Sequence, residues 1–258
     1  MADLAQETRA PADSCLMGHR CIAIVPALNE EESLGRVIDE IRVFEPDFEI
    51  VVVDDGSTDR SAAVAAEHGA TVLRLPFNLG IGGAVQTGYR YAYEKGFDLA
   101  VQIDGDGQHD PRELPAIITP VLEGEADLVI GSRFALPTGY RAAFVRRFGM
   151  LVFARIISAV VGQRLTDTSS SFRAFNRRSL ALFANDYPHG FLETVEASVG
   201  AVKHGLRIRE VPVTMRQRTS GRSSLTLALS FYYSIKVLVA VFIGLFRRPN
   251  VDHLREER

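Results

Sequence analysis

Cysteine is scarce in this sequence, and several common site patterns are missing. The 258 residues include only Cys15 and Cys21, which excludes a disulfide scaffold and a zinc site built from cysteines. Residues 1–20 contain no apolar run of the signal-peptide kind, so we expect no signal peptide and a flexible tail there. The sequence also shows no evident Ser/His/Asp arrangement and no recognised nucleic-acid-binding motif. Evidence for a function must therefore come from the distribution of charge and from the positions of the aspartates and glycines.

Negative charge and positive charge are concentrated in opposite halves of the chain. Residues 1–132 hold 9 lysines and arginines against 24 acidic residues, and residues 133–258 hold 20 against 8, although the net charge is only −3. This asymmetry suggests two tasks, a cation held by the acidic half and an anion held by the basic half. The alternative is two solvated faces of opposite sign.

Strand and helix patterns alternate along the first half. Apolar runs predict strands, and helical spacing of apolar residues predicts helices between them. We expect Asn29 to cap the first helix, and Ser57 or Thr58 to cap the second, which stops at Gly69. The expected strands are 21–25, 50–53, 71–75, 99–103 and 128–130, and the expected helices are 30–42, 57–68, 84–95 and 111–123. This order predicts an α/β fold, a mostly parallel twisted sheet with helices on both faces, whose ligands bind beyond the carboxyl ends of the strands.

Two pairs of aspartates follow two of these strands directly. Asp54 and Asp55 come after IVVV, while Asp104 and Asp106 come after LAVQI and are separated by one glycine. Carboxylates that converge in one crevice suit Mg²⁺ or Mn²⁺. An Asp-Gly-Asp-Gly turn alone would be an ordinary turn, but its place after a strand, matched by a second acidic pair, favours a metal site.

The glycine-rich stretch 77–84 resembles a dinucleotide-binding fingerprint only weakly. Its third glycine is Gly83 and not position 85, and it opens the wrong strand–helix unit, so a Rossmann dehydrogenase is disfavoured. We expect Gly80 and its neighbours to let the start of a helix approach a nucleotide.

A single long apolar stretch occupies residues 225–246. As a helix it would be about 33 Å long, which is just enough to span a bilayer. Lys236 near its middle disfavours insertion, so we expect a helix or a pair of helices on the membrane surface. A full span and a helix buried in the core or in a homo-oligomer are the alternatives.

Several ordered motifs resemble one known family. PALNEEESL, VVVDDGSTD, NLGIGGAVQTGY, QIDGDGQHDP and GSRF are similar in order and spacing to family 2 glycosyltransferases of the GT-A fold. DTSSSFRAF, GFLETVEASVGAVKHG and EVPVTMRQRTSGRSSL are similar to its dolichyl- and polyprenyl-phosphate sugar synthases, such as dolichyl-phosphate mannosyltransferase. The resemblance implies a catalytic domain over 21–224, with a donor half (21–132) and an acceptor half (133–224), followed by a membrane-associating helical segment and basic tail (225–258).

The resemblance also implies a role for individual residues. Asp104 and Asp106, with Gln108 beside them, would hold Mg²⁺ or Mn²⁺ on the donor diphosphate, and Arg133 would face the phosphates as a catalytic residue. The donor site would comprise Pro26, Ala27, Asn29, Glu30, Asp54, Asp55, Gly80, Gln108 and Arg218. The acceptor phosphate would be bound by Arg146 or Arg147 together with Arg173 and Arg222. Two departures stand out: Ser171 replaces the usual glycine, and Ser224 replaces the usual lysine.

The expected reaction is an inverting, metal-dependent transfer of mannose or glucose from GDP-mannose or UDP-glucose to polyprenyl phosphate at the cytoplasmic face of the membrane. A phosphate acceptor is already anionic and needs no strong general base, which agrees with the missing triad. The alternatives are transfer to a non-lipid acceptor, a nucleotidyltransferase and a non-catalytic nucleotide-sugar-binding protein. Anionic lipid explains the basic and apolar second half better than nucleic acid does, so no nucleic-acid partner is expected.

Overall fold

The apolar runs form the central strands of one sheet. The computed structural model describes residues 18–134, 158, 162, 165–188 and 193–216. Four of the predicted strands are β1 (Cys21–Ala27), β2 (Glu49–Asp54), β4 (Leu99–Gln102) and β5 (Leu128–Ser132). Their residues are buried almost without exception, as expected of strands covered on both faces.

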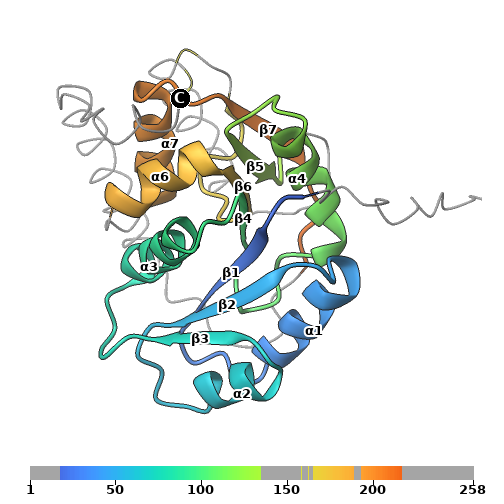
Figure 1. Cartoon of the computed structure of the whole chain (residues 1–258), viewed down its shortest axis with the longest axis vertical. Helices are drawn as coiled ribbons and strands as arrows, with labels where there is room; N and C mark the ends of the chain where they lie inside the picture. The colour runs from blue at the N-terminus through green and yellow to red at the C-terminus, as the bar shows by residue number, and fades with distance from the viewer. Residues whose placement is uncertain (1–17, 135–157, 159–161, 163–164, 189–192, 217–258) are drawn as a thin grey trace, which may run out of the picture.

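The sheet has seven strands in the order β3-β2-β1-β4-β6-β5-β7 (Figure 1). The other three are β3 (Thr71–Arg74), β6 (Arg173–Asn176) and β7 (Ile208–Pro212). All neighbours are parallel except β6, which runs antiparallel to both β4 and β5. The prediction of a mostly parallel α/β sheet is confirmed, and its one antiparallel strand, β6, lies between β4 and β5.

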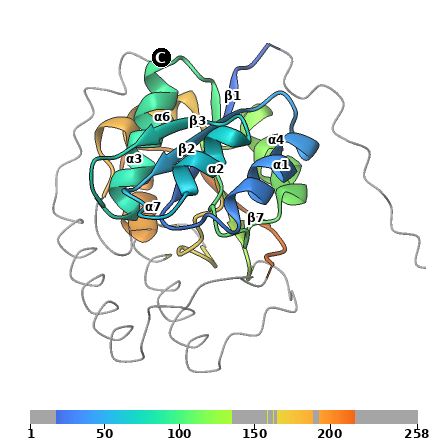
Figure 2. The same cartoon turned by 90° about the horizontal axis from the view of Figure 1, so that it is seen from below.

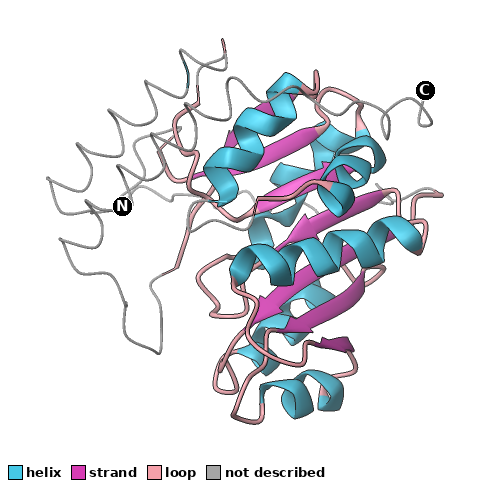
Figure 3. Cartoon of the chain, turned by 90° about the vertical axis from the view of Figure 1, so that its left-hand side faces the viewer, coloured by secondary structure: helices cyan, strands magenta, loops and turns pink. Residues whose placement is uncertain are grey.

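Helices cover both faces of the sheet, as Figures 2 and 3 show. Side chains alternate along β1, so Ile22 and Ile24 pack toward one helical layer while Ala23 and Val25 pack toward the other. The first layer contains α3 (Ile81–Glu94), α6 (Arg177–Asn185) and α7 (Glu193–Lys203). The second contains α1 (Leu34–Phe44), α2 (Ser61–Glu67) and α4 (Leu114–Leu122), with the short 3₁₀ helix η1 (Pro111–Glu113) before α4.

The predicted helix starts are wrong in both of the first two helices. The first begins at Leu34, because Asn29 adopts a left-handed φ of 55° and its side chain accepts a hydrogen bond from the backbone of Thr58 at 2.9 Å. The second begins at Ser61, and the hydroxyl of Ser57 accepts from the backbone of Asn29 at 3.0 Å. These polar side chains therefore join two loops to each other and do not cap helices. The predicted stop at Gly69 is confirmed, with a φ of 73°.

Among the helices that the structure describes, none is both long and apolar enough to cross a membrane. The apolar stretch 225–246 lies outside the described residues.

One glycine of the NLGIGGAVQTGY motif sets the distance between α3 and the sheet. A Cβ atom built on Gly88 would lie 2.3 Å from Cγ2 of Ile24, a fully buried residue of β1. This glycine is therefore required for packing, and it lies seven residues beyond the helix start.

We predict that Gly88→Ala destabilises the protein by about 1–3 kcal/mol, because the added methyl overpacks the contact between α3 and β1. Urea unfolding followed by circular dichroism measures the change. Gly200→Ala in α7 is the matched control, because a Cβ there meets nothing within 4 Å and alanine favours a helix. Equal stabilities of the two variants would contradict the packing role of Gly88.

Candidate active site at the carboxyl ends of the strands

The loops after β1, β2 and β4 meet at one edge of the sheet. The backbone of Asp55 donates to the carbonyl of Ala27 at 2.9 Å, and that of Gly105 donates to the carbonyl of Pro26 at 3.4 Å. Ser33 joins the same loops, since its hydroxyl lies 2.8 Å from the carbonyl of Gly105 and 3.1 Å from the carboxylate of Glu30. The loops of the first two motifs are therefore brought together with the Asp104 turn.

Asp54 is a fully buried carboxylate at the end of β2. Its Oδ1 accepts a hydrogen bond from the backbone of Ser57 at 3.0 Å. Its Oδ2 lies 3.4 Å from Nε of the exposed Arg74 and accepts no hydrogen bond from any residue that the structure describes. Because buried polar atoms are normally hydrogen-bonded, this oxygen is suited to accept from a bound molecule.

Asp55 has a different task from its neighbour. Its Oδ1 accepts from the backbone of Leu79 at 2.7 Å and so fastens the loop that precedes α3. Gly80 ends this loop with a φ of 82°, a backbone conformation that glycine adopts without strain. Asp55 thus shapes the site by holding the Gly80 loop in place.

The turn after β4 presents Asp104, Asp106 and Gln108 side by side along the chain. Oδ1 of Asp106 accepts from the backbone of Gln108 at 3.0 Å. Oδ2 of Asp104 accepts from the hydroxyl of Ser171 at 2.6 Å, and the backbone of Asp104 donates to Nδ1 of His109 at 3.0 Å. Oδ1 of Asp104 is buried and makes no hydrogen bond within the described part of the chain.

This turn fits a divalent ion that takes its remaining ligands from water and substrate. Hard cations prefer carboxylate oxygens, and Mg²⁺ in particular is often held by one or two carboxylates together with phosphates. The unpartnered Oδ1 of Asp104 is the atom that such an ion would satisfy. No group of three or more His, Cys, Asp and Glu side chains with metal-binding geometry occurs among the described residues, so an all-protein cage is not formed there.

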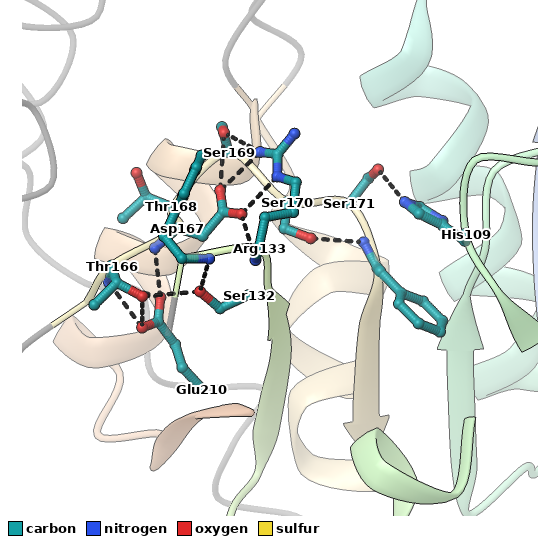
Figure 4. Close-up of polar contacts among 12 residues, drawn as sticks. His109, Ser132, Arg133, Thr166, Asp167, Thr168, Ser169, Ser170, Ser171 and Glu210 are labelled. Carbon is teal, nitrogen blue, oxygen red and sulfur yellow. Dashed lines mark hydrogen bonds and ion pairs between the residues drawn. The ribbon is translucent and has the colours of Figure 1, made fainter. Parts of the chain in front are cut away.

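Arg133, at the end of β5, is held by Asp167 (Figure 4). Its Nε and Nη2 contact the two carboxylate oxygens at 2.7 and 2.8 Å, and Nη2 also contacts Ser169 at 2.7 Å. Burial opposes ionisation of Asp167, but the hydrogen bonds and charge of Arg133 hold its pKa below the usual range. The predicted catalytic Arg133 is thus placed in a buried bidentate ion pair.

Glu210 of β7 anchors the other side of the same loop. Its carboxylate accepts from the backbones of Thr166 and Asp167 at 2.7–2.9 Å, and the hydroxyl of Thr166 contacts both Glu210 and Ser132 at 2.8 Å. Asp167 is the single acid in residues 133–178, and Glu210 is the single acid in residues 203–224. Their isolation among arginines is the sequence signal for this network.

Arg173 begins β6 and is 1% exposed. Its guanidinium donates to the carbonyls of Ser170 and Thr194 at 2.8 and 2.9 Å. Its Nη1 has no hydrogen-bond partner in the described residues. Burial raises the pKa of the nearby Glu193 to about 7, against the opposing effect of the Arg173 charge. Arg173 is therefore a buried cation inside the protein, at the start of β6.

Four further arginines that the sequence predicts for the site lie outside the described residues: Arg146, Arg147, Arg218 and Arg222. The chain just before the last two is joined to the turn after β4, because the backbone of Arg216 donates to the carbonyl of Gln108 at 2.8 Å.

We predict that Asp167→Asn lowers the free energy of unfolding by about 3 kcal/mol, because it leaves the partly buried Arg133 guanidinium without the charge of the buried Asp167. Arg133→Met in the same chain should restore part of the loss. Urea unfolding of the two single variants and the double variant measures this coupling. A loss below about 1 kcal/mol in Asp167→Asn would contradict a structural role for the pair.

Comparison with known proteins identifies the family of this chain. The profile of "Glycosyl transferase family 2" matches residues 22–183. The chain is 32% identical over 216 residues to undecaprenyl-phosphate mannosyltransferase of Micrococcus luteus, covering 80% of this chain and 88% of that protein. It is 31% identical over 209 residues to UDP-N-acetylglucosamine–dolichyl-phosphate N-acetylglucosaminyltransferase of Methanococcus voltae, covering 74% and 83%.

A solved structure shares the fold. Glucosyl-3-phosphoglycerate synthase of Mycobacterium tuberculosis, crystallised with Mn²⁺, UDP and glucosyl-3-phosphoglycerate, superposes with a TM-score of 0.67 at 23% identity, covering 90% of this chain and 81% of that one. The fold is therefore GT-A, as predicted. The chain belongs to glycosyl transferase family 2, is a hexosyltransferase, and resembles the polyprenyl-phosphate sugar synthases.

Proposed function

We propose that this enzyme transfers a hexose from a nucleoside diphosphate sugar to polyprenyl phosphate with the help of a divalent ion. The observation that carries the proposal is a pair of buried carboxylate oxygens, Oδ2 of Asp54 and Oδ1 of Asp104, at the carboxyl ends of two strands of the same sheet. Neither has a hydrogen-bond partner within the described chain. Oδ2 of Asp54 is suited to accept a hydrogen bond from a nucleoside, and Oδ1 of Asp104 is suited to bind a cation.

The donor side is assigned to the loops after β1 and β2. Asp54 offers a fixed acceptor for an N–H group of the base, and the joined loops of Asn29 and Ser57 form the wall beside it. Asp55 and Gly80 shape the next loop. Pro26, Ala27 and Glu30 complete this donor surface.

Asp104 and Asp106, with Gln108 beside them, are the residues that would hold Mg²⁺ or Mn²⁺. Two crystal structures that share this fold contain Mn²⁺ and Mg²⁺, respectively. When bound, the ion would neutralise the diphosphate leaving group. The chain's own part is to carry both carboxylates on one turn and to leave one oxygen of Asp104 without a hydrogen-bond partner among the described residues.

The acceptor is assigned to the basic half. Two relatives are named for transfer to undecaprenyl phosphate and dolichyl phosphate. A phosphate oxygen can attack the anomeric carbon directly, with inversion, and the carbon–oxygen bond to the diphosphate breaks in the same step. Arg173 contributes buried positive charge next to β4, and Arg146, Arg147 and Arg222 stay predictions for direct phosphate contact. Arg133 acts through the loop that it holds with Asp167.

The donor sugar is the finer part of the proposal. We retain mannose or glucose, from GDP-mannose or UDP-glucose. The relatives' names include mannosyl, N-acetylglucosaminyl and galacturonate transfer, so the panel should contain all of these donors. Counting radiolabel in the lipid phase identifies the sugar, and a soluble hydroxyl acceptor in a parallel arm tests the non-lipid alternative.

We predict that Asp106→Ala lowers transfer to polyprenyl phosphate in the presence of Mg²⁺ by more than about 100-fold, since even residues that only orient metal ligands are worth 10–100-fold. The control is Glu123→Ala, which removes an exposed carboxylate at the C-terminal end of α4 and should leave transfer unchanged. Activity of Asp106→Ala like that of the unaltered enzyme would refute the metal assignment.

We also propose that the protein acts at the cytoplasmic face of a membrane, through the basic half and residues 225–246. The full chain should sediment with vesicles that contain anionic lipid, and binding should weaken as salt is raised. Equal recovery in the supernatant with and without anionic vesicles would contradict this placement. Neutral vesicles with and without polyprenyl phosphate separate surface charge from recognition of the acceptor.

A further inference from the structure

Asp104 is held at its backbone and at one carboxylate oxygen, and its other oxygen is left without a partner in the described chain. We propose that Ser171 and His109 are positioning residues that fix Asp104 so that Oδ1 alone is offered to the divalent ion. The inference rests on the metal assignment made in the proposed function. It adds two residues with no such role in that assignment.

Ser171 makes the stronger of the two contacts. Its hydroxyl lies 2.6 Å from Oδ2 of Asp104, the distance typical of a hydrogen bond from a hydroxyl to a carboxylate. A carboxylate oxygen engaged in this way is a poorer ligand for a metal than its neighbour. The contact therefore chooses between the two oxygens of Asp104.

His109 fixes the backbone of the same residue. Its Nδ1 accepts from the backbone N–H of Asp104 at 3.0 Å, so the ring proton is on Nε2, which faces Ser171 at 3.5 Å and Oδ2 of Asp104 at 3.7 Å. The ring is 4% exposed and stacks on Phe172 with 4.8 Å between centroids. Packing thus keeps the imidazole in one orientation.

The loop that carries Ser171 is itself anchored. Figure 4 shows Thr166 and Asp167 bound to Glu210, and Asp167 bound to Arg133, only a few residues before Ser171. Immediately after Ser171, the strand β6 pairs with β4 through Arg173 and Gln102. With both sides of the loop fixed, the Ser171 hydroxyl has little freedom to leave Asp104.

This arrangement has a consequence for which ion is preferred. Mg²⁺ requires a nearly ideal octahedral arrangement, whereas Ca²⁺ accepts bidentate carboxylates and irregular geometry. Occupation of Oδ2 by Ser171 disfavours a bidentate Asp104. We therefore expect Ser171 to favour Mg²⁺ and Mn²⁺ over Ca²⁺.

The test is Mn²⁺ binding to the full chain without any substrate, followed by electron paramagnetic resonance of the free ion. Ser171→Ala should raise the Kd for Mn²⁺ about 10-fold, as expected for loss of a residue that orients a metal ligand. Competition with Ca²⁺ should show a smaller preference for Mn²⁺ in Ser171→Ala. Ser171→Thr, which keeps the hydroxyl, should restore both values.

His109 is tested in the same assay by a pair of variants. His109→Ala should weaken Mn²⁺ binding about 10-fold. His109→Asn should recover most of it, because the asparagine oxygen can accept from the backbone of Asp104 as Nδ1 does. Thr119→Ala is the matched control, since the Thr119 hydroxyl donates to the carbonyl of Pro115 within α4 and its loss should leave Mn²⁺ affinity unchanged.

Thermal unfolding of each variant separates positioning from a loss of folding. A Kd for Ser171→Ala within twofold of the unaltered protein would overturn the proposal, as would an equal loss in Thr119→Ala. Absence of Mn²⁺ binding to the unaltered protein would also overturn it. In that case, transfer to polyprenyl phosphate in the presence of EDTA would show that the reaction itself stands without the metal.

Discussion

The antiparallel strand β6 is the constraint on which the site depends. Arg173 of β6 pairs with Gln102 of β4 and with Ile130 of β5. Because β6 runs in the opposite direction, its beginning lies where its two neighbours end. Ser171 is thereby brought to Asp104, and Asp167 to Arg133. A parallel strand in this position would have placed the same loop at the far edge of the sheet.

The loop before β6 is stabilised by charges that are themselves buried. Asp167 is 2% exposed, and its partner Arg133 occupies both of its oxygens. Such a pair adds little net stability compared with apolar residues, because both ions lose water, but removal of one partner is costly. The pair is therefore better understood as a means of specifying one loop conformation. Glu210 adds three further hydrogen bonds to Thr166 and one to Asp167, which makes the conformation hard to exchange for another.

The fold of the first half and the place of its aspartates at the edge of the sheet could be predicted from the sequence, but contacts between loops could not. Apolar runs such as IVVV have one stable place, the interior of a sheet, and the aspartates that follow them must then lie at its carboxyl edge. The prediction that Asn29 and Ser57 cap helices is wrong, because a polar side chain before a helix can either cap it or bind a neighbouring loop. Local sequence does not distinguish these two possibilities. Ser171 was visible only as a departure from a family pattern. Its partner, Asp104, is 67 residues away along the chain.

The acidic half and the basic half of the chain meet where Ser171 contacts Asp104. The acidic half supplies Asp104, and the basic half supplies the residue that holds it, yet that residue is a serine and not an arginine. An arginine at this point would orient the carboxylate and also cancel its charge, leaving less attraction for a cation. The hydroxyl of Ser171 donates to the carboxylate of Asp104 without neutralising it, and Nδ1 of His109 accepts from the backbone of Asp104. In the loop before β6, Asp167 is instead paired with Arg133. The two aspartates thus have different partners, and the contact with Ser171 leaves the charge of Asp104 for the divalent ion that we propose there.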